Sequence, residues 1–310
     1  MRIVRDHRFV APQDKGASVA IGNFDGVHLG HQSVIELAGT QAPDAPLGVL
    51  TFEPHPREFF APSAPAFRLM SRAARAHRLE KLGVERLYEL NFNAALSGLT
   101  PEAFAHDVIS VGLGLTHVVV GHDFCFGKGR AGTSADLQAF GAQMGFGVTI
   151  APLLERADHT VSSTAIRQAL TEGRPQDAAA MLGHWHRIEG PIIGGEQRGR
   201  EMGYPTANMS VKGLHLPAFG VYAVLVDVLT GPHAGRYQGA ANLGIRPMFD
   251  GDMPNLETFL FDFSGDLYGA QVSVGLVSYL RPEAKFDSLE ELIKQMEADC
   301  AAAKEVLTNR

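Results

Sequence analysis

Residues 22–31 read Gly22-Asn23-Phe24-Asp25-Gly26-Val27-His28-Leu29-Gly30-His31, and this stretch decides the fold of the first half of the chain. It follows the apolar run Ser18–Ile21, which predicts a buried strand, and a helical pattern begins near Leu29. Where a strand turns through glycines into a helix, the backbone can approach a ligand, and the N–H groups of the helix start point toward it. The stretch, which we call the histidine loop, therefore predicts a phosphate-binding site.

His28 and His31 lie three residues apart at the start of the expected helix, so both imidazoles can face an anion from the same side of its first turn. A charge-assisted hydrogen bond contributes about 1.5–3 kcal/mol, against roughly 0.3–1 kcal/mol for a helix dipole. The two histidines are therefore candidates for charge stabilisation, against the alternative of ordinary helix-start residues. A zinc site is disfavoured, because metalloprotease helices carry His-Glu-x-x-His and no third ligand is evident here.

Outward from the histidine loop, short apolar runs alternate with helical segments. The expected strands are Ser18–Ile21, Gly48–Phe52, Arg86–Leu90, His117–Gly121 and Gly147–Ile150. The expected helices between them are Gly30–Ala38, Ser71–Leu82 and Ser134–Met144. This alternation predicts a parallel sheet covered by helices.

The composition changes after Pro175, where a glycine-rich segment begins, and we place a domain boundary at residue 183. The expected strands beyond it are Val221–Leu229, Tyr237–Ala241, Leu256–Phe263 and Gln271–Leu280. Turn residues separate these strands, which predicts a small antiparallel barrel. Ser288 followed three residues later by Glu291 marks the start of a closing helix. Two domains are expected, residues 1–183 and 184–310.

The bulk composition excludes several classes of protein. The chain has 310 residues, of which 45% are hydrophobic and 20% charged, and no apolar run approaches the roughly 20 residues of a membrane span. No secretory signal is recognisable, so a cytoplasmic location is expected. Two cysteines disfavour a disulfide framework, and a net charge of -7 disfavours nonspecific binding to nucleic acid. We expect small anionic substrates, with neither nucleic acid nor membrane as partner.

A second motif is Val161-Ser162-Ser163-Thr164-Ala165-Ile166-Arg167, in which three hydroxyl residues precede a helical segment and an arginine lies one turn in. Hydroxyl groups and a guanidinium together can bind a polyphosphate. The simpler alternative is helix capping, which contributes about 1 kcal/mol without any ligand.

Two further motifs make the pattern specific: Thr51-Phe52-Glu53-Pro54-His55-Pro56 and Gly121-His122-Asp123-Phe124-Cys125-Phe126-Gly127. With the histidine loop and the Ser-Ser-Thr segment, they occur in the order found in bacterial FAD synthetases, which this chain resembles. The resemblance implies an α/β fold: a Rossmann-like nucleotidylyltransferase domain with a parallel sheet, then a small antiparallel β-barrel riboflavin kinase domain and a C-terminal helix. It also implies two activities, phosphorylation of riboflavin to FMN and adenylyl transfer from ATP to FMN, giving FAD and pyrophosphate.

The resemblance assigns roles to residues of the first domain. His28 and His31 would bind the triphosphate of the co-substrate ATP, and Arg167 would brace the β- and γ-phosphates as pyrophosphate leaves. No acid or base is required, because the FMN phosphate is already a nucleophile at neutral pH. The other nucleotide-binding candidates are Gly22, Asn23, Phe24, Asp25, Gly30, Ser162, Ser163 and Thr164. The flavin-binding candidates are Asp123, Phe124 and Phe126.

In the second domain, Gly199-Arg200-Glu201-Met202-Gly203-Tyr204-Pro205-Thr206-Ala207-Asn208 resembles the riboflavin kinase signature. Thr206 and Asn208 would contact Mg²⁺ and the phosphates of ATP. Glu257, in a strand-like segment, matches the catalytic base that accepts the proton of the ribityl hydroxyl. The remaining candidates are Gly203 and Pro205 for the nucleotide and Arg246 for the flavin.

The chain departs from the family pattern at a few positions. Ile245 and Met248 stand where threonines are usual, Phe259 stands where histidine is common, and Glu53 stands where aspartate is frequent. One alternative is therefore an FMN adenylyltransferase with a weakened kinase domain. Another is a noncatalytic flavin sensor, against which the complete set His28, His31, Arg167 and Glu257 argues. The sequence predicts no oligomeric state.

Overall fold

The computed structural model of the chain describes residues 1–152, 155–156, 159–194, 204–246 and 253–309. These residues form two compact units, which are described separately: Met1–Pro65 with Arg75–Val161, and Ala66–Ala74 with Ser162–Arg310. The second unit includes residues 162–183, which the sequence places before the domain boundary. The division into functional domains at residue 183 stays a prediction.

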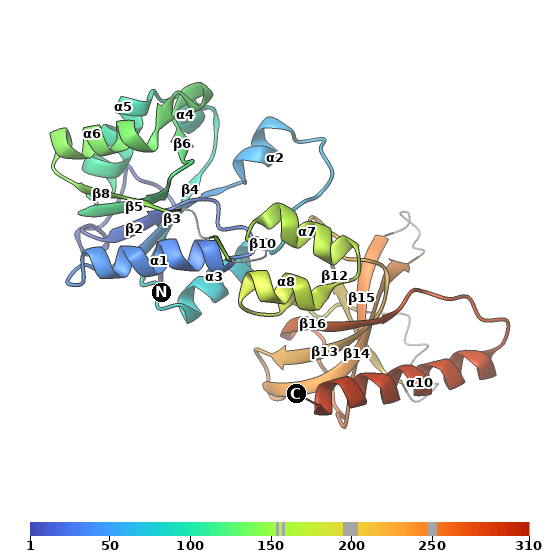
Figure 1. Cartoon of the computed structure of the whole chain (residues 1–310). Coiled ribbons are helices and arrows are strands. Elements are labelled where there is room, and N and C mark those ends of the chain that lie inside the picture. Colours follow the sequence, from blue (N-terminus) through green and yellow to red (C-terminus); the bar gives the residue numbers. More distant parts are fainter. Residues whose placement is uncertain (153–154, 157–158, 195–203, 247–252, 310) are drawn as a thin grey trace. The chain divides into compact units, whose positions relative to one another are not determined.

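A parallel six-stranded sheet forms the centre of the first unit, in the order β1-β4-β3-β2-β5-β8 (Figure 1). Its strands are β1 (Arg2–Val4), β2 (Ser18–Ile21), β3 (Leu47–Glu53), β4 (Arg86–Asn91), β5 (His117–Gly121) and β8 (Gly147–Ala151). Every neighbouring pair is parallel. The predicted parallel sheet is confirmed, and β1 adds an edge strand for which the sequence gives no clear signal.

Helices and short strands complete the first unit. They are η1 (Pro12–Asp14), α1 (Leu29–Gln41), α2 (Pro56–Phe60), α3 (Arg72–Lys81), α4 (Ala94–Ser97), α5 (Pro101–Ala103), η2 (Phe104–Gly112), η3 (Lys128–Arg130), α6 (Ser134–Met144), β6 (Cys125–Phe126), β7 (Gly132–Thr133), β9 (Glu155–Arg156) and β10 (His159–Thr160). Residues 72–74 of α3 cluster with the second unit. All four residues of β2 are buried, as an apolar strand at the centre of such a sheet must be.

An antiparallel sheet forms the second unit, in the order β11-β16-β13-β14-β15-β12. The strands are β11 (His186–Pro191), β12 (Thr206–Ser210), β13 (Gly220–Val228), β14 (Gly235–Arg246), β15 (Met253–Leu260) and β16 (Gln271–Arg281). A bridge between Ile193, just after β11, and Asn208 of β12 joins the two edges of the sheet. The sheet thus curls into the predicted small barrel around an apolar interior that includes Val224, Leu256 and Leu276.

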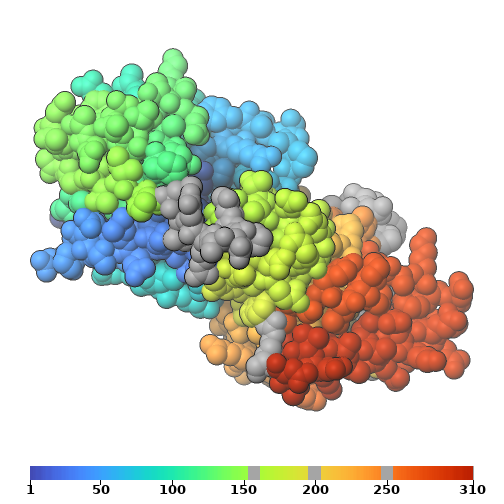
Figure 2. Space-filling model, viewed as in Figure 1, coloured from blue at the N-terminus to red at the C-terminus, as the bar shows by residue number. Residues whose placement is uncertain are grey.

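The terminal helix α10 (Leu289–Thr308) covers the outer face of this barrel and forms part of the molecular surface (Figure 2). Its Ala303 and Leu307 pack on barrel residues such as Phe261. Arg281 of β16 makes two hydrogen bonds of 2.8 and 2.6 Å to the carboxylate of Asp299 on the helix. The predicted Ser288 cap is present, since its side chain accepts a hydrogen bond from the N–H of Glu291.

Two short helices, α7 (Ser163–Thr171) and α8 (Pro175–Leu182), also belong to the second unit. Ile166, Leu170 and Leu182 form an apolar cluster with Leu69. In the part of the chain that the structure describes, no helix is both long and apolar enough to cross a membrane.

Candidate functional site

Three of the motifs meet at one edge of the parallel sheet. The histidine loop follows β2, the segment beginning at Pro54 follows β3, and the segment beginning at His122 follows β5. Strand β2 lies between β3 and β5 in the sheet. After β2, the chain adds β3 and β4 on one side of it, and later adds β5 and β8 on the other side. In open parallel sheets, such a reversal of strand order places the ligand crevice at the carboxyl ends of the strands. The histidine loop occupies this position.

His28 caps helix α1 with its own ring. Its Nδ1 accepts a hydrogen bond of 3.2 Å from the N–H of His31, and the two rings stack with centroids 3.6 Å apart and an interplanar angle of 13°. Gly30 allows this close approach, because a Cβ at this position would lie 3.2 Å from Cε1 of the His28 ring and would crowd it. The two imidazoles are therefore stacked on the same side of the first turn, and an anion contact for them stays a prediction.

This geometry sets the protonation of the pair. Because Nδ1 of His28 accepts a hydrogen bond, a neutral His28 ring carries its proton on Nε2, which can donate to a ligand. Burial, together with the neighbouring His28 ring, lowers the pKa of His31 well below its usual value. The neutral form of His31 is therefore favoured.

The remaining residues of the histidine loop are mostly buried. Phe24 is 1% exposed and Asp25 is 6% exposed. The backbone of Phe24 and of Val27 takes positive φ angles of 53° and 45°. The carbonyl of Asn23 accepts hydrogen bonds from Thr51 and from Arg75. The sequence signals Asn23 and Asp25 as parts of the site but not Arg75, which lies about fifty residues away.

An aromatic cluster that the sequence motifs do not indicate lies near the same edge of the sheet. Phe59 and Phe60 end helix α2, and each makes an edge-to-face contact with Phe92, which also contacts Phe52. Phe60 is 68% exposed, although large apolar side chains are usually covered. The only available sequence signal is the pair of phenylalanines shortly after Pro-His-Pro. Exposed aromatic rings of this kind suit stacking against a planar ligand.

The segment after β5 carries the flavin-binding candidates. Phe126 is 6% exposed and belongs to the apolar core, where it contacts Phe104. Phe124 stacks on Phe126 with centroids 5.6 Å apart and is partly buried. Asp123 lies in the turn between them and β5. A flavin contact for these residues stays a prediction.

The Ser-Ser-Thr segment lies in the second unit, at the start of α7. Ser162 caps this helix by accepting a hydrogen bond from the N–H of Ala165, as the capping alternative expects. Arg167 donates to Oγ1 of Thr164 and to the carbonyl of Phe67, and its guanidinium lies 5.8 Å from the Phe67 ring centroid. Ser163 is the first residue of the helix. A phosphate contact for this group stays a prediction.

The kinase candidates form a row across three strands of the second unit. Glu257 of β15 pairs with Asn208 of β12 on one side and with Asn242 of β14 on the other. In the neighbouring row, Thr206 pairs with Phe259. Directly paired residues project from the same face of a sheet, so these side chains share a surface. This is the outer face of the barrel, because the alternate residues of β15 point into its interior.

Asn208 is 6% exposed, and its carboxamide is held at both ends. Its Oδ1 accepts a 2.8 Å hydrogen bond from Asn255, and its Nδ2 donates to the carbonyl of Thr206 at 3.3 Å. Phe259 contacts the rings of Tyr204 and Phe261, with centroids 5.1 and 6.0 Å apart. An aromatic packing role thus replaces the imidazole that is common at this position.

The other positions of the kinase signature have fewer described contacts. Pro205 is exposed, and Arg246 is the last residue of β14. Ile245 is 48% exposed. Gly203 and Met248 lie outside the described residues.

The donor set at Thr206 and Asn208 can be compared with the needs of Mg²⁺. The described residues contain no group of three or more histidine, cysteine, aspartate or glutamate side chains arranged to hold a metal. Thr206 and Asn208 offer neutral oxygens, and the Asn208 oxygen is already oriented by Asn255. Mg²⁺ typically takes only one or two protein ligands together with substrate phosphates. These residues therefore fit a metal that arrives with a nucleotide.

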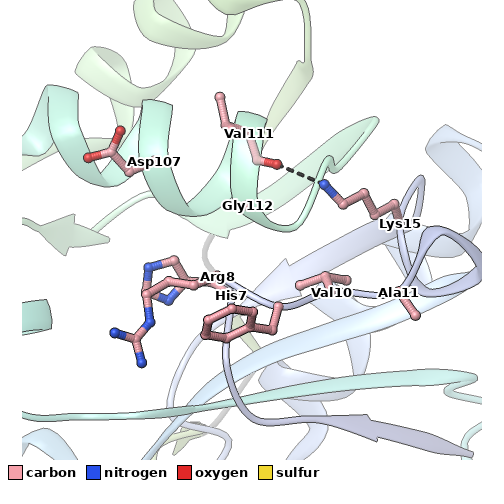
Figure 3. Close-up of a pocket in the computed structure, with 9 residues that line it drawn as sticks. His7, Arg8, Val10, Ala11, Lys15, Asp107, Val111 and Gly112 are labelled. Atoms are coloured by element: carbon pink, nitrogen blue, oxygen red, sulfur yellow. Dashed lines mark hydrogen bonds between the residues drawn. The ribbon is translucent and has the colours of Figure 1, made fainter.

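A hollow of about 780 Å³ in the first unit lies elsewhere (Figure 3). Lys15, which donates to the carbonyl of Val111, and Gly112 line one end of it. Lys15 shortly precedes β2 and Gly112 shortly precedes β5, so this end lies on the amino edge of the parallel sheet. The histidine loop is on the opposite, carboxyl edge.

Comparison with known sequences finds a match for each half of the chain. The profile of the FAD synthetase family matches residues 10–165, and that of the riboflavin kinase family matches residues 182–307. The bifunctional riboflavin kinase/FMN adenylyltransferase of Pseudomonas fluorescens is 40% identical over 308 residues, covering 98% of this chain and 97% of that protein. The protein of the same description from Bacillus subtilis is 34% identical and covers 100% and 98% of the two chains.

A solved structure also matches along the whole length. The crystal structure of a protein described as a macrolide-efflux protein from Streptococcus pneumoniae is 32% identical, with a TM-score of 0.83. The match covers 100% of this chain and 99% of that one. The fold along this chain is therefore similar to that of a known structure.

Proposed function

This chain belongs to the family of bifunctional riboflavin kinases and FMN adenylyltransferases, whose two activities it combines, and we propose which of its residues perform each one. The histidine loop and the Ser-Ser-Thr segment serve adenylyl transfer from ATP to FMN. The row Asn208, Glu257 and Asn242 serves phosphorylation of riboflavin. Both reactions use ATP, which fits a cytoplasmic enzyme.

For adenylyl transfer, an oxygen of the FMN phosphate attacks the α-phosphorus of ATP. A bond forms between them, the bond from the α-phosphorus to the bridging oxygen breaks, and pyrophosphate leaves. No proton has to be removed from the attacking phosphate, so the protein contributes alignment and charge stabilisation. The Nε2–H of His28 and the start of α1 are proposed to bind the triphosphate, and Arg167 to brace the leaving pyrophosphate.

Flavin is proposed to bind beside the histidine loop. The exposed ring of Phe60, held edge-to-face by Phe59 and Phe92, offers a surface for the isoalloxazine ring. Asp123 and Phe124 follow β5 and would complete this side of the site.

For phosphorylation, the ribityl hydroxyl of riboflavin attacks the γ-phosphorus of ATP and ADP leaves. A hydroxyl is a weak nucleophile, so a positioned carboxylate that accepts its proton accelerates the step. Glu257 is proposed as this base. Thr206 and Asn208 would hold Mg²⁺, which neutralises charge on the phosphates when bound.

The observation that supports the kinase assignment best is the strand register. Glu257 lies opposite both Asn208 and Asn242, so a base and two amides from three separate sequence segments share one surface.

Chromatography of flavins separates the two activities. Incubation with riboflavin, ATP and Mg²⁺ should give FMN and then FAD, and incubation with FMN should give FAD directly. Absence of both products would contradict the proposal.

A second candidate, an adenylyltransferase with a weakened kinase, is favoured by one observation. Phe259 packs between Tyr204 and Phe261, where an imidazole would offer a hydrogen bond to the substrate. This candidate predicts rapid formation of FAD from FMN and slow formation of FMN from riboflavin. A Phe259→His variant should then accelerate only the second reaction. Equal rates of both reactions in the unaltered protein would exclude the candidate.

A further inference from the structure

Beneath the histidine loop lies a charged side chain that the reaction as described does not use. Arg75 of α3 is 3% exposed, although arginine is almost never fully buried without partners. Its Nη1 donates to the carbonyl of Asn23 at 3.2 Å. Its Nη2 donates to Glu53 at 3.1 Å and to Glu89 at 3.2 Å. One guanidinium thus connects the histidine loop to the ends of β3 and β4.

The histidine loop needs such support because its backbone is strained. Phe24 and Val27 have φ angles of 53° and 45°. Each L-residue held in a left-handed conformation costs about 1–2 kcal/mol, and a β-branched residue such as Val27 rarely adopts it. Conformations of this kind persist only where the surrounding structure holds them, and they concentrate at functional sites.

Several contacts hold the strained segment at its two ends. The carbonyl of Asn23, just before Phe24, accepts from Arg75 and from Thr51, the latter at 3.2 Å. The carbonyl of Val27 accepts a 2.8 Å hydrogen bond from Gln32. Among these three hydrogen bonds, the one from Arg75 is charge-assisted, and such bonds contribute more than neutral ones.

The two carboxylates fix the orientation of the guanidinium. Glu89 is 2% exposed and also lies 3.6 Å from Nε of Arg5. Glu53 precedes the Pro-His-Pro segment, and its longer side chain reaches Arg75 at a position where the family frequently has aspartate. A planar guanidinium can serve two carboxylates and a carbonyl at once, whereas a lysine ammonium cannot reproduce this fork.

We propose that Arg75 is a positioning residue for adenylyl transfer, which holds the carbonyl of Asn23 so that the histidine loop presents His28 and the start of α1 to the triphosphate. The inference rests on the proposed role of the histidine loop. Arg75 is too deeply buried to meet the substrate and acts through the loop.

The test is the Arg75→Lys variant of the full chain, which retains the positive charge and loses the fork. The turnover number for FAD formation from FMN should fall by about 10- to 100-fold, since small misplacements of a catalytic group cost that much. The KM for ATP should change less than the turnover number. FMN formation from riboflavin by the same protein should stay within about twofold, because that site lies in the other unit.

Arg86→Lys is the matched control. Arg86 also joins a carboxylate and a backbone carbonyl, with Asp14 at 3.2 Å and Gln13 at 3.1 Å, but it does so at the amino edge of the sheet. Hydrogen–deuterium exchange of the peptide 22–32 gives a second measurement. A general loss of stability would accelerate exchange throughout the first unit and not in this peptide alone. Exchange there should accelerate in Arg75→Lys and not in Arg86→Lys.

Different results contradict the role of Arg75 and the proposed role of the histidine loop. Unchanged FAD formation in Arg75→Lys would overturn the inference, as would an equal fall of both activities or equal effects of the two lysine variants. Failure of the unaltered protein to make FAD from FMN would instead contradict the proposed function of the histidine loop.

Discussion

The two candidate sites of this protein are built in opposite ways. The histidine loop is an irregular segment with two left-handed non-glycine residues, Phe24 and Val27, between a strand and a helix. The kinase row lies on regular antiparallel strands, where Glu257 is placed by ladder pairing with Asn208 and Asn242. A loop needs dedicated contacts to hold its shape, whereas a strand position is held by the sheet. The first site accordingly has a buried charged network beneath it.

Each of the two regions also contains a buried histidine. His31, in the histidine loop, has a pKa lowered by burial and by its stacked neighbour His28. His186, in the barrel, has a pKa lowered to about 3 by burial first and by His184 and His215 next. Burial thus lowers the pKa of a histidine at the proposed ligand site in one region and within the barrel in the other.

The largest effect should come from Glu257→Gln, which removes the proposed base and preserves shape. General base catalysis contributes about 10²- to 10⁴-fold, so FMN formation from riboflavin should fall within that range. FAD formation from supplied FMN should be unchanged. Chromatography of the flavins gives the rates of both reactions, and their ratio is compared with that of the unaltered protein. A parallel loss of both activities would break the distinction between the two regions.

A somewhat smaller effect is expected from His28→Asn in the histidine loop. Asparagine is a good helix cap, so the variant retains the capping role seen for His28 and removes the imidazole, with its Nε2–H donor and its stacking on His31. Loss of one preorganised donor costs about 10²- to 10³-fold, which should appear in FAD formation from FMN. The thermal midpoint should stay near that of the unaltered protein. Full activity in His28→Asn would show that His28 serves only as the helix cap.

A smaller loss of activity is expected for Asn255→Leu, which removes the hydrogen-bond donor that orients the Asn208 carboxamide. Loss of residues that orient a ligand-binding group typically costs 10- to 100-fold, here in FMN formation and in binding of ADP with Mg²⁺. Calorimetric titration of the full chain measures the binding. Thr258→Val is the control, because Oγ1 of Thr258 is buried and has no hydrogen-bond partner among the described residues. That variant should retain activity and gain up to about 1 kcal/mol of stability.

The smallest effect concerns pH and the barrel. The folded-state pKa of His186 is about 3, below the ordinary histidine pKa of 6.5, so the unfolded chain binds more protons between these values. Stability should therefore fall as the pH decreases below 6.5, by at most about 1.4 kcal/mol per pH unit from this group. Thermal unfolding at pH 7, 6 and 5 measures the slope. A His186→Phe variant with the same slope would exclude His186 as its cause.

Much of the fold is predictable from local patterns. The strands of the parallel sheet are apolar runs, and the predicted segments at β2 and β5 agree with the structure residue for residue. The strand expected to run to Phe263 instead ends at Leu260, shortly before Asp262 adopts a φ of 53°. β12 escapes prediction because it is short, three of its five residues (Thr206, Asn208 and Ser210) are polar, and its pairing with β15 is a nonlocal contact.

The candidate site is less predictable than the fold. The sequence identifies the histidine loop, Asn208 and Glu257, since these residues carry recognisable motifs. It does not signal Arg75 or Asn255, which act on the motif residues from distant segments. It also predicts two imidazoles on the same side of the first turn, but it does not predict that their rings stack on each other. Supporting residues have no local pattern of their own, because any element that packs close enough can provide them.

The sequence by itself determined the two-part architecture and the chemistry of each half, because apolar periodicity and glycine placement act locally and motif residues are chosen for their reactivity. The tertiary structure alone decided which groups share a surface and how burial shifts their pKa values. The register that sets Glu257 between two asparagines, the stacked histidines with their lowered pKa at His31, and the support of Asn23 by Arg75 all depend on burial and on contacts between distant segments. Those quantities exist only once the chain has folded.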